Sequence, residues 1–241
     1  MNSPAPVPAI ATGQAEPTLD PAITAHERGQ VVSVNVGMPR IHDTAKGPVN
    51  TAIWKSPVIG CVRTVGVNLE GDAQADSKNH GGPHKAIYAY AVEDLSYWEQ
   101  RLGRQLSPGA MGENLTTRGI DPNEALIGER WAVGSTILEV SEPRSPCYRL
   151  GLRHDEPTLP RRFIAAQRPG AYLRIIRQGD IGAGDGVEVI SRPDHQVTVR
   201  LAFRAWLIDR SLVPLLREAP QLSDAWTTWI DRDPDRRASI E

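Results

Sequence analysis

Hydrophobic and polar residues alternate along several short stretches of this chain, and the alternation predicts β-strands. The clearest stretch is residues 30–37, where valines occupy positions 31, 32, 34 and 36. Further strands are predicted at residues 53–58, 61–67, 85–91, 128–133, 135–140, 171–177 and 186–190. Glycine-rich corners separate these strands, and the helices that a parallel α/β sheet needs between strands are missing. The pattern predicts a mainly β protein, a barrel with small helical insertions.

Helical periodicity is limited to a few segments. Residues 93–104 and 159–167 predict two short helices within the barrel region. After residue 193 the character changes, and helices are predicted at residues 197–207, 211–217 and 223–230. Thr198 is suited to cap the first of these three helices. We therefore expect three regions, which are a disordered Pro/Ala-rich tail (1–28), a β-barrel domain (29–192) and a three-helix C-terminal domain (193–241).

Composition narrows the class of protein. The chain is 40% hydrophobic and 23% charged, which is ordinary for a globular domain, and its net charge of −2 argues against a nucleic-acid-binding surface. No apolar run is long enough for a membrane helix, and residues 1–25 lack the features of a signal peptide. Two cysteines far apart in the sequence are typical of a reduced, cytoplasmic protein. Cys61 lies in an apolar strand and is expected to be a small buried residue.

Cys147 has different surroundings. It follows the predicted strand 135–140, with Arg144 before it and Arg149 after it. Fixed positive charge stabilises a thiolate over a thiol, and a thiolate can serve as nucleophile, redox centre or soft metal ligand. The histidines lie in loop contexts with no orienting partner, which weakens the case for a cysteine-protease arrangement.

Three further loops are rich in polar residues and glycine, and each lies at the edge of a predicted strand. In residues 79–86, two glycines and a lysine could cradle a phosphate, or they form a tight hairpin turn. The acidic residues of 66–74 could act in acid/base chemistry or as turn formers and salt-bridge partners. The loop at 111–117 could hold a heterocycle or cap a turn. The candidate residues of these loops are Glu70, Asp72, His80, Gly81, Gly82, Lys85, Gly112, Glu113 and Asn114.

Together these segments resemble the MOSC domain family, and more narrowly its bacterial YiiM-like group. The motifs that carry the resemblance are Leu69-Glu70-Gly71-Asp72, His80-Gly81-Gly82-Pro83-x-Lys85, Gly112-Glu113-Asn114-Leu115 and Pro143-Arg144-Ser145-Pro146-Cys147-Tyr148. They occur in the family's order and span roughly residues 30–190. His84 departs from the family pattern, in which an acidic residue is frequent at this position.

The resemblance implies a β-barrel that binds the molybdenum cofactor, a pterin dithiolene with a phosphate. Cys147 would be the catalytic residue and the protein ligand of molybdenum, which suits a soft thiolate. Arg144, Lys85 and the backbone of Gly81 and Gly82 would face the phosphate. The remaining cofactor-binding residues implied by the motifs are Glu70, Asp72, His80, Gly112, Glu113, Asn114, Ser145 and Tyr148.

The expected activity is the reduction of small N-hydroxylated compounds, such as N-hydroxylated purines. The chain shows no dinucleotide-binding fingerprint and no iron–sulfur cysteine set, so a separate electron-donating reductase, a flavoprotein or similar, is the expected partner. A homodimer is one candidate assembly, and no nucleic-acid or membrane partner is expected. Two alternatives stay open, a sulfur carrier with a Cys147 persulfide and a binding module without turnover.

Overall fold

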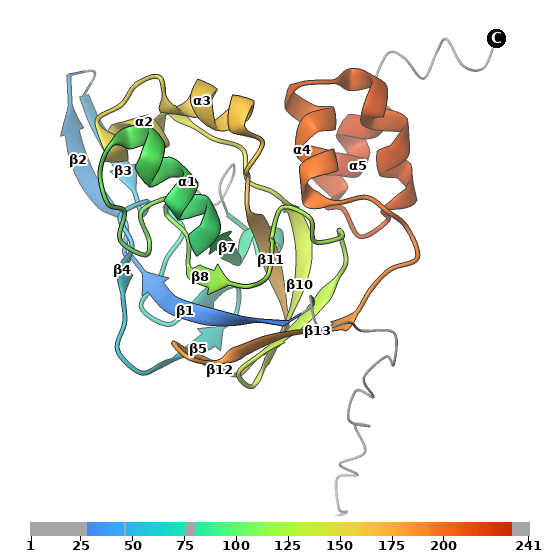
Figure 1. Ribbon diagram of the computed structural model, residues 1–241, viewed down its shortest axis with the longest axis horizontal. Helices are drawn as coiled ribbons and strands as arrows, with labels where there is room; N and C mark the ends of the chain where they lie inside the picture. The colour runs from blue at the N-terminus through green and yellow to red at the C-terminus, as the bar shows by residue number, and fades with distance from the viewer. Residues whose placement is uncertain (1–27, 46, 76–80, 233–241) are drawn as a thin grey trace, which may run out of the picture.

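The computed structural model describes residues 28–45, 47–75 and 81–232, and its centre is a closed barrel of seven strands (Figure 1). Around the barrel the strands pair in the order β1–β13–β9–β10–β11–β7–β8, and the pairing of β8 with β1 closes the ring. Their bounds are β1 Arg28–Val36, β7 Ile87–Ala91, β8 Leu115–Arg118, β9 Arg130–Val133, β10 Thr136–Pro143, β11 Ala171–Arg177 and β13 Gly186–Ser191. The predicted barrel is confirmed, while the predicted tail lies outside the described residues except for Arg28.

Closure of the barrel depends on β1, the longest strand. Its first half pairs with β13 and its second half with β8, and the register shifts between Val31 and Ser33. A register shift of this kind bends the strand, so β1 can pair first with β13 and then with β8. Gly29 lies at the crowded start, where a Cβ would stand 2.7 Å from the carbonyl oxygen of Arg118. Only a residue without a side chain allows this approach.

All barrel pairs are antiparallel except β7 with β8. Parallel neighbours need a crossover connection, and here helix α1 (Val92–Leu102) provides it. The helix begins directly after β7 and ends at Gly103, which adopts the left-handed conformation with φ 65°. The predicted helix at 93–104 is confirmed to within two residues.

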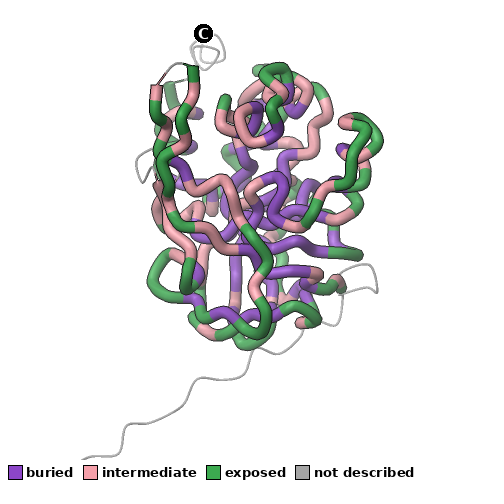
Figure 2. The backbone as a smooth tube through the Cα atoms, turned by 90° about the vertical axis from the view of Figure 1, so that its left-hand side faces the viewer, coloured by how far each residue is buried: buried purple, intermediate pink, exposed green. Residues whose placement is uncertain are grey.

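Two hydrophobic clusters hold the elements together. The barrel interior is filled by buried side chains of alternating strand positions, which appear as the central buried segments of Figure 2. The second cluster lies outside β7, where Trp98 of α1 stacks on Phe163 with ring centroids 5.9 Å apart and donates a 2.8 Å hydrogen bond to Tyr90. This cluster joins α1 to helices α2 (Tyr148–His154) and α3 (Leu159–Ala166).

The C-terminal segment forms α4 (Val199–Leu207), the 3₁₀ helix η3 (Arg210–Glu218) and α5 (Asp224–Asp231). Thr198 caps α4 as predicted, since its hydroxyl accepts a 3.0 Å hydrogen bond from the Leu201 N–H. Pro214 lies inside η3 and lacks the N–H that a regular α-helix needs there. The buried faces of these helices join the same hydrophobic cluster as the barrel interior.

The predicted strand at 61–67 is confirmed over its first five residues as β5 Cys61–Val65, and β4 Ser56–Pro57 lies within the predicted strand at 53–58. Short elements that were not predicted include β2 Arg40–Thr44, β3 Gly47–Thr51, β6 Asn68–Leu69, β12 Asp180–Gly182 and the 3₁₀ turn η2 Pro83–Lys85. The predicted strand at 53–58 was too long, because only two of its residues pair with β1. The predicted burial of Cys61 was wrong. Alternation along β5 turns Val62 and Thr64 inward, so Cys61 is exposed.

Candidate functional site

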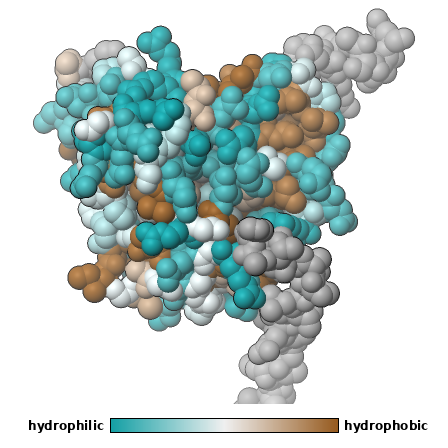
Figure 3. Space-filling view, viewed as in Figure 1, coloured by the Kyte–Doolittle hydropathy of each residue, from teal (hydrophilic) through white to brown (hydrophobic). Residues whose placement is uncertain are grey.

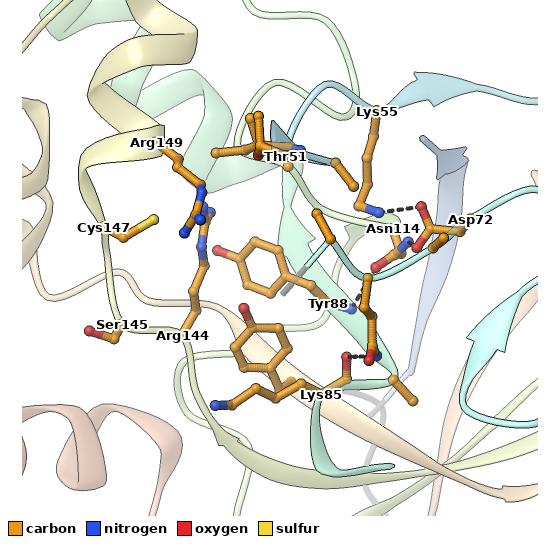
Figure 4. Close-up of a pocket in the computed structure, with 18 residues that line it drawn as sticks. Thr51, Lys55, Asp72, Lys85, Tyr88, Asn114, Arg144, Ser145, Cys147 and Arg149 are labelled. Carbon is orange, nitrogen blue, oxygen red and sulfur yellow. Dashed lines mark hydrogen bonds and ion pairs between the residues drawn. The ribbon is translucent and has the colours of Figure 1, made fainter. Parts of the chain in front are cut away.

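A chain of strand pairings brings the cysteine segment and the Gly112–Asn114 loop to the same rim of the barrel. Pro143 of β10 pairs with Ala171, Ala171 with Ala89, and Ala89 with Leu115 of β8. Pro143 and Leu115 therefore lie at the same level, and Arg144, which follows Pro143, donates to the Met111 carbonyl in the loop that precedes Leu115. Between the two segments is a cavity of about 110 Å³ (Figure 4).

Cys147 lies on the wall of this cavity and precedes the first turn of α2. Its side chain is partly exposed, and Figure 4 shows it beside Arg144 and Arg149. The predicted pairing of the thiol with positive charge is therefore present in space as well as in sequence. Neighbouring cations favour the thiolate form of a cysteine.

Arg144 is held by a buried aromatic cluster. Its guanidinium lies 4.8 Å from the ring centre of Tyr88 and donates to the carbonyl oxygen of Met111. Burial lowers the pKa of Arg144, but attraction to Tyr88 and Cys147 outweighs burial and raises it. Next to it, burial raises the pKa of Tyr172 to about 12, so this phenol stays protonated. The cavity thus combines a fixed positive charge with phenolic hydroxyl groups.

The opposite wall is a buried ion pair between Lys55 and Asp72. The side chains are 9% and 4% exposed, and the lysine ammonium donates to Oδ1 of Asp72. The same oxygen accepts a 2.8 Å hydrogen bond from the Gly37 N–H, and Oδ2 accepts one of 2.9 Å from Asn114. Burial lowers the pKa of Lys55, and the Asp72 charge opposes this shift. Asp72 is therefore a salt-bridge partner, one of the two roles expected for it.

Asn114 connects two strands and the Asp72 loop at the floor of the cavity. Its side-chain oxygen accepts from the Tyr88 N–H at 3.1 Å, and its amide group donates to Asn35 O at 3.2 Å and to Asp72. Both amide hydrogens are thus used inside the protein. The residue lines the cavity while its side chain fixes β7 against β1.

Glu113 and Gly112 shape the loop that precedes β8. The buried carboxylate of Glu113 accepts hydrogen bonds from the backbone N–H groups of Gly109 (2.6 Å) and Met111 (2.9 Å). Burial raises the pKa of Glu113, and these hydrogen bonds oppose the rise. Gly112 has φ +82°, and a Cβ there would stand 2.9 Å from Cγ1 of Ile53. The loop therefore needs glycine at this position and a buried acceptor beside it.

The Gly81–Gly82 turn is fixed by Gln74. The glutamine side chain accepts a 2.7 Å hydrogen bond from the Gly82 N–H and donates one of 3.2 Å to the Lys85 carbonyl. The Lys85 ammonium lies 3.3 Å from the carboxylate of Glu142 and is 25% exposed. In Figure 4 the Lys85 side chain extends along the lower side of the cavity towards Ser145. The lysine is therefore positioned to meet an anion at this rim.

The structure brings together part of the predicted site. The predicted residues that line the cavity are Asp72, Lys85, Gly112, Asn114, Arg144, Ser145 and Cys147. Gly81 lines a neighbouring groove, while Glu113 is buried beneath the loop and Glu70 and Tyr148 are exposed outside the cavity. Gly82 serves the turn through its N–H, and His80 lies outside the described residues.

The sequence motifs did not indicate the lining residues Thr51, Ile53, Lys55, Tyr88 and Tyr172. Arg149 was noted for its charge two residues from the cysteine but was not among the candidate site residues, and it also lines the cavity. The segment 51–55 carried no such signal, because it reaches the cavity only through the β2–β3 hairpin. The two tyrosines pair with each other across β7 and β11, and that pairing depends on the tertiary fold.

Comparison with known proteins identifies the family. A sequence model of the MOSC domain matches residues 76–188. The protein named "Uncharacterized protein YflK" from Bacillus subtilis (strain 168) is 32% identical over 89% of this chain and 99% of its own length. The chain belongs to the MOSC domain family. The predicted resemblance is thereby confirmed.

Two further relatives place this MOSC protein more narrowly. The crystal structure of YiiM from Geobacillus stearothermophilus matches it with a TM-score of 0.70 and 28% identity, covering 85% of this chain and 98% of YiiM. A protein named "Reductase" from Gibberella moniliformis (strain M3125 / FGSC 7600) is 31% identical over 73% of this chain and 32% of its own length. The YiiM-like fold extends over most of the chain.

The side chains at the cavity limit the kinds of ligand that can bind there. Among residues 28–45, 47–75 and 81–232, no three His, Cys, Asp or Glu side chains cluster as a metal site. A metal at this rim would need most of its ligands from a bound group, with Cys147 as the one protein thiolate. The positive side chains around it suit an anionic partner.

No helix of the described residues has the length and apolar character to span a membrane.

Proposed function

We propose that this MOSC protein binds the molybdenum cofactor and reduces N-hydroxylated compounds, with Cys147 as the molybdenum ligand. The observation that carries the proposal is the position of Cys147 on a cavity wall beside the guanidinium groups of Arg144 and Arg149. The similarity to a protein named reductase supports an oxidoreductase role.

The residues of the cavity fit this cofactor in their chemistry. A soft thiolate suits molybdenum, and the positive groups of Arg144, Arg149 and Lys85 suit the anionic phosphate. The cavity itself, at about 110 Å³, is below the usual size of a ligand site, about 300–1,000 Å³. A groove of about 610 Å³ adjoins it and shares Lys85, Ser145 and Tyr172, so a larger molecule has room.

Each side chain then has a defined task. Cys147 anchors the cofactor, which when bound supplies the two-electron redox chemistry of its metal. Arg144 holds negative charge in place, because its own position is fixed by Tyr88 and the Met111 carbonyl. Tyr172 remains protonated and can donate a hydrogen bond to an oxygen at the rim. The sequence has only two cysteines, fewer than the four that most iron–sulfur clusters use as ligands, so electrons would come from a separate reductase.

The test compares two cysteine variants, Cys147→Ser and Cys61→Ser, after gentle purification. We expect Cys147→Ser to lose bound molybdenum and the reduction of N-hydroxylated purine, while its melting temperature stays within a few degrees of wild type. Cys61 is exposed on β5 and does not line the cavity, so Cys61→Ser is the matched control and should retain both. Stoichiometric molybdenum and full turnover in Cys147→Ser would refute the ligand role.

A sulfur carrier is the second candidate, because the partly exposed Cys147 thiol could also hold a persulfide. Mass spectrometry of the intact protein separates the two. A sulfane-sulfur adduct on Cys147 in metal-free protein supports the carrier, and molybdenum with an unmodified thiol supports the reductase. Tight cofactor binding without reduction of any N-hydroxylated compound would instead indicate a binding module.

A further inference from the structure

The groove next to the cysteine cavity lies between the barrel and the C-terminal helices. Its volume is about 610 Å³, within the range of sites that hold whole small molecules. One side consists of η2 and the end of β10, and the other of residues from α4 and from the start and body of α5. It shares Lys85, Ser145 and Tyr172 with the cysteine cavity, so the two spaces are continuous at these residues.

Tryptophan rings form the helical side of the groove. Trp226 is buried and meets Trp206 and Trp229 edge to face, with ring centroids 5.1 Å and 5.6 Å apart. Trp206 and Trp229 are only partly buried, and both line the groove. Hydrophobic residues also gather over the C-terminal helices on the face seen in Figure 3. Partly exposed aromatic side chains favour the stacking of flat rings, and on Trp229 one ring face is already covered by the Arg210 guanidinium, 4.7 Å from the ring centre.

His84 supplies a polar atom on the barrel side. Its backbone is fixed because the Ser141 hydroxyl donates to its carbonyl, and its side chain is partly buried and lines the groove. Burial lowers the pKa of His84, so the ring is neutral at pH 7 and one ring nitrogen can accept a hydrogen bond.

The two spaces differ in charge. The cysteine cavity is lined by Arg144 and Arg149, whereas the groove contains neither arginine and has the carboxylate of Asp224 beside the paired charges of Lys85 and Glu142. An anionic phosphate is therefore favoured in the cavity, and an uncharged ring with N–H groups is favoured in the groove. The arrangement would place the cofactor in the cavity and the substrate in the groove, with the two in contact near Cys147.

We propose that this groove is the ring-binding subsite of the enzyme, taking a flat, uncharged nitrogen heteroaromatic ring between Trp206 and Trp229 with His84 as a hydrogen-bond acceptor. The inference rests on the proposed function, since the ring is that of the N-hydroxylated substrate. The family match ends at residue 188, so both tryptophans come from the segment beyond it. This helical segment would then determine which N-hydroxylated compounds reach the cysteine.

The test measures binding by calorimetry with full-length protein and three probes, which are N6-hydroxylaminopurine, acetohydroxamic acid and a neutral pterin. We expect the purine to bind at least tenfold more tightly than the ring-free hydroxamate. Trp229→Leu or Trp206→Leu should weaken purine binding about tenfold, or about 1.4 kcal/mol. Leu215→Ala is the control, because Leu215 is 42% exposed on η3 outside the groove. Melting temperatures show whether each variant is folded.

A pair of histidine variants keeps the proposal testable if a tryptophan variant unfolds. His84→Leu should weaken purine binding, and His84→Asn, which keeps a polar side chain on the same wall of the groove, should restore part of it. Equal binding of purine and hydroxamate, or unchanged binding in folded tryptophan and histidine variants, overturns the proposal. Preferential binding of the pterin would assign the groove to the cofactor and also overturn it.

Failure of the proposed function gives a different result. If the groove binds purine but Cys147→Ser retains molybdenum and turnover, the ligand role is wrong while the subsite stands. If activity depends on Cys147 but not on the tryptophans or His84, the function stands and the subsite is wrong.

Discussion

His154 should make this protein sensitive to mild acid. The residue ends helix α2 and is 6% exposed. Its Nδ1 lies 3.0 Å from the Arg104 guanidinium, and its Nε2 lies 3.0 Å from the Ala110 carbonyl oxygen. An arginine can only donate, so Nδ1 is the acceptor and the single ring proton is on Nε2. Protonation would place a second N–H against a guanidinium.

The size of the effect follows from the pKa difference between folded and unfolded chains. Burial, together with Arg104 and Arg153, lowers the pKa of His154 from 6.5 to about 4 in the folded protein. The unfolded chain therefore binds a proton first as pH falls, and the stability given by the neutral ring is lost between about pH 6.5 and 4. From pH 7.5 to 5 the loss would reach roughly 2 kcal/mol, and water around the arginines reduces it to about 1–2 kcal/mol.

The assay is urea unfolding at pH 7.5 and at pH 5 for wild type and His154→Gln. Glutamine can still donate to the Ala110 carbonyl but does not titrate, so the variant should be less stable at pH 7.5 and lose about 1–2 kcal/mol less between the two pH values. Other titrating groups cancel in this difference. If both proteins lose the same free energy of unfolding, the ring does not titrate as the structure implies.

Two further predictions concern the cavity walls. Lys55→Met leaves the buried Asp72 carboxylate without its cation and should lower the free energy of unfolding by about 3–5 kcal/mol, measured by denaturant titration, and Lys55→Met with Asp72→Asn should recover part of the loss. Equal losses in the single and double variants would contradict this account. Gly112→Ala combines a positive φ with a Cβ 2.9 Å from Ile53 and should lower the melting temperature and the molybdenum content. Gly103→Ala, at φ +65° with no atom within 4 Å, controls for backbone strain alone and should retain molybdenum.

The barrel was predictable from sequence because its strands alternate and its helices do not fall between most strands. Residues 30–37 carry the valines that point into the barrel, and β1 covers nearly the same range. The hairpin of β2 and β3 was missed because its burial pattern has almost no buried residue, so hydrophobicity gives no signal there. Helix α2 was also missed, because its seven residues are too few to give a clear periodic signal.

The candidate site was predictable only in part. Cys147 and Arg144 are close in sequence and remain close in space, and local charge was enough to find them. Lys55 was not found, because its importance depends on Asp72, which is 17 residues away and meets it only after folding. Sequence motifs show which residues matter, and the tertiary contacts decide whether a residue faces a ligand or another part of the protein.

This distinction divides the polar residues of the site into two groups. Internal hydrogen bonds occupy the side-chain atoms of Asp72, Glu113 and Asn114. These residues lie near the place where β7 pairs in parallel with β8. Cys147 and Lys85, by contrast, are partly exposed at the cavity. A substitution in the first group should act through stability, and one in the second through binding. The chemistry of the site therefore depends on few side chains, and the internal network keeps them at the same rim.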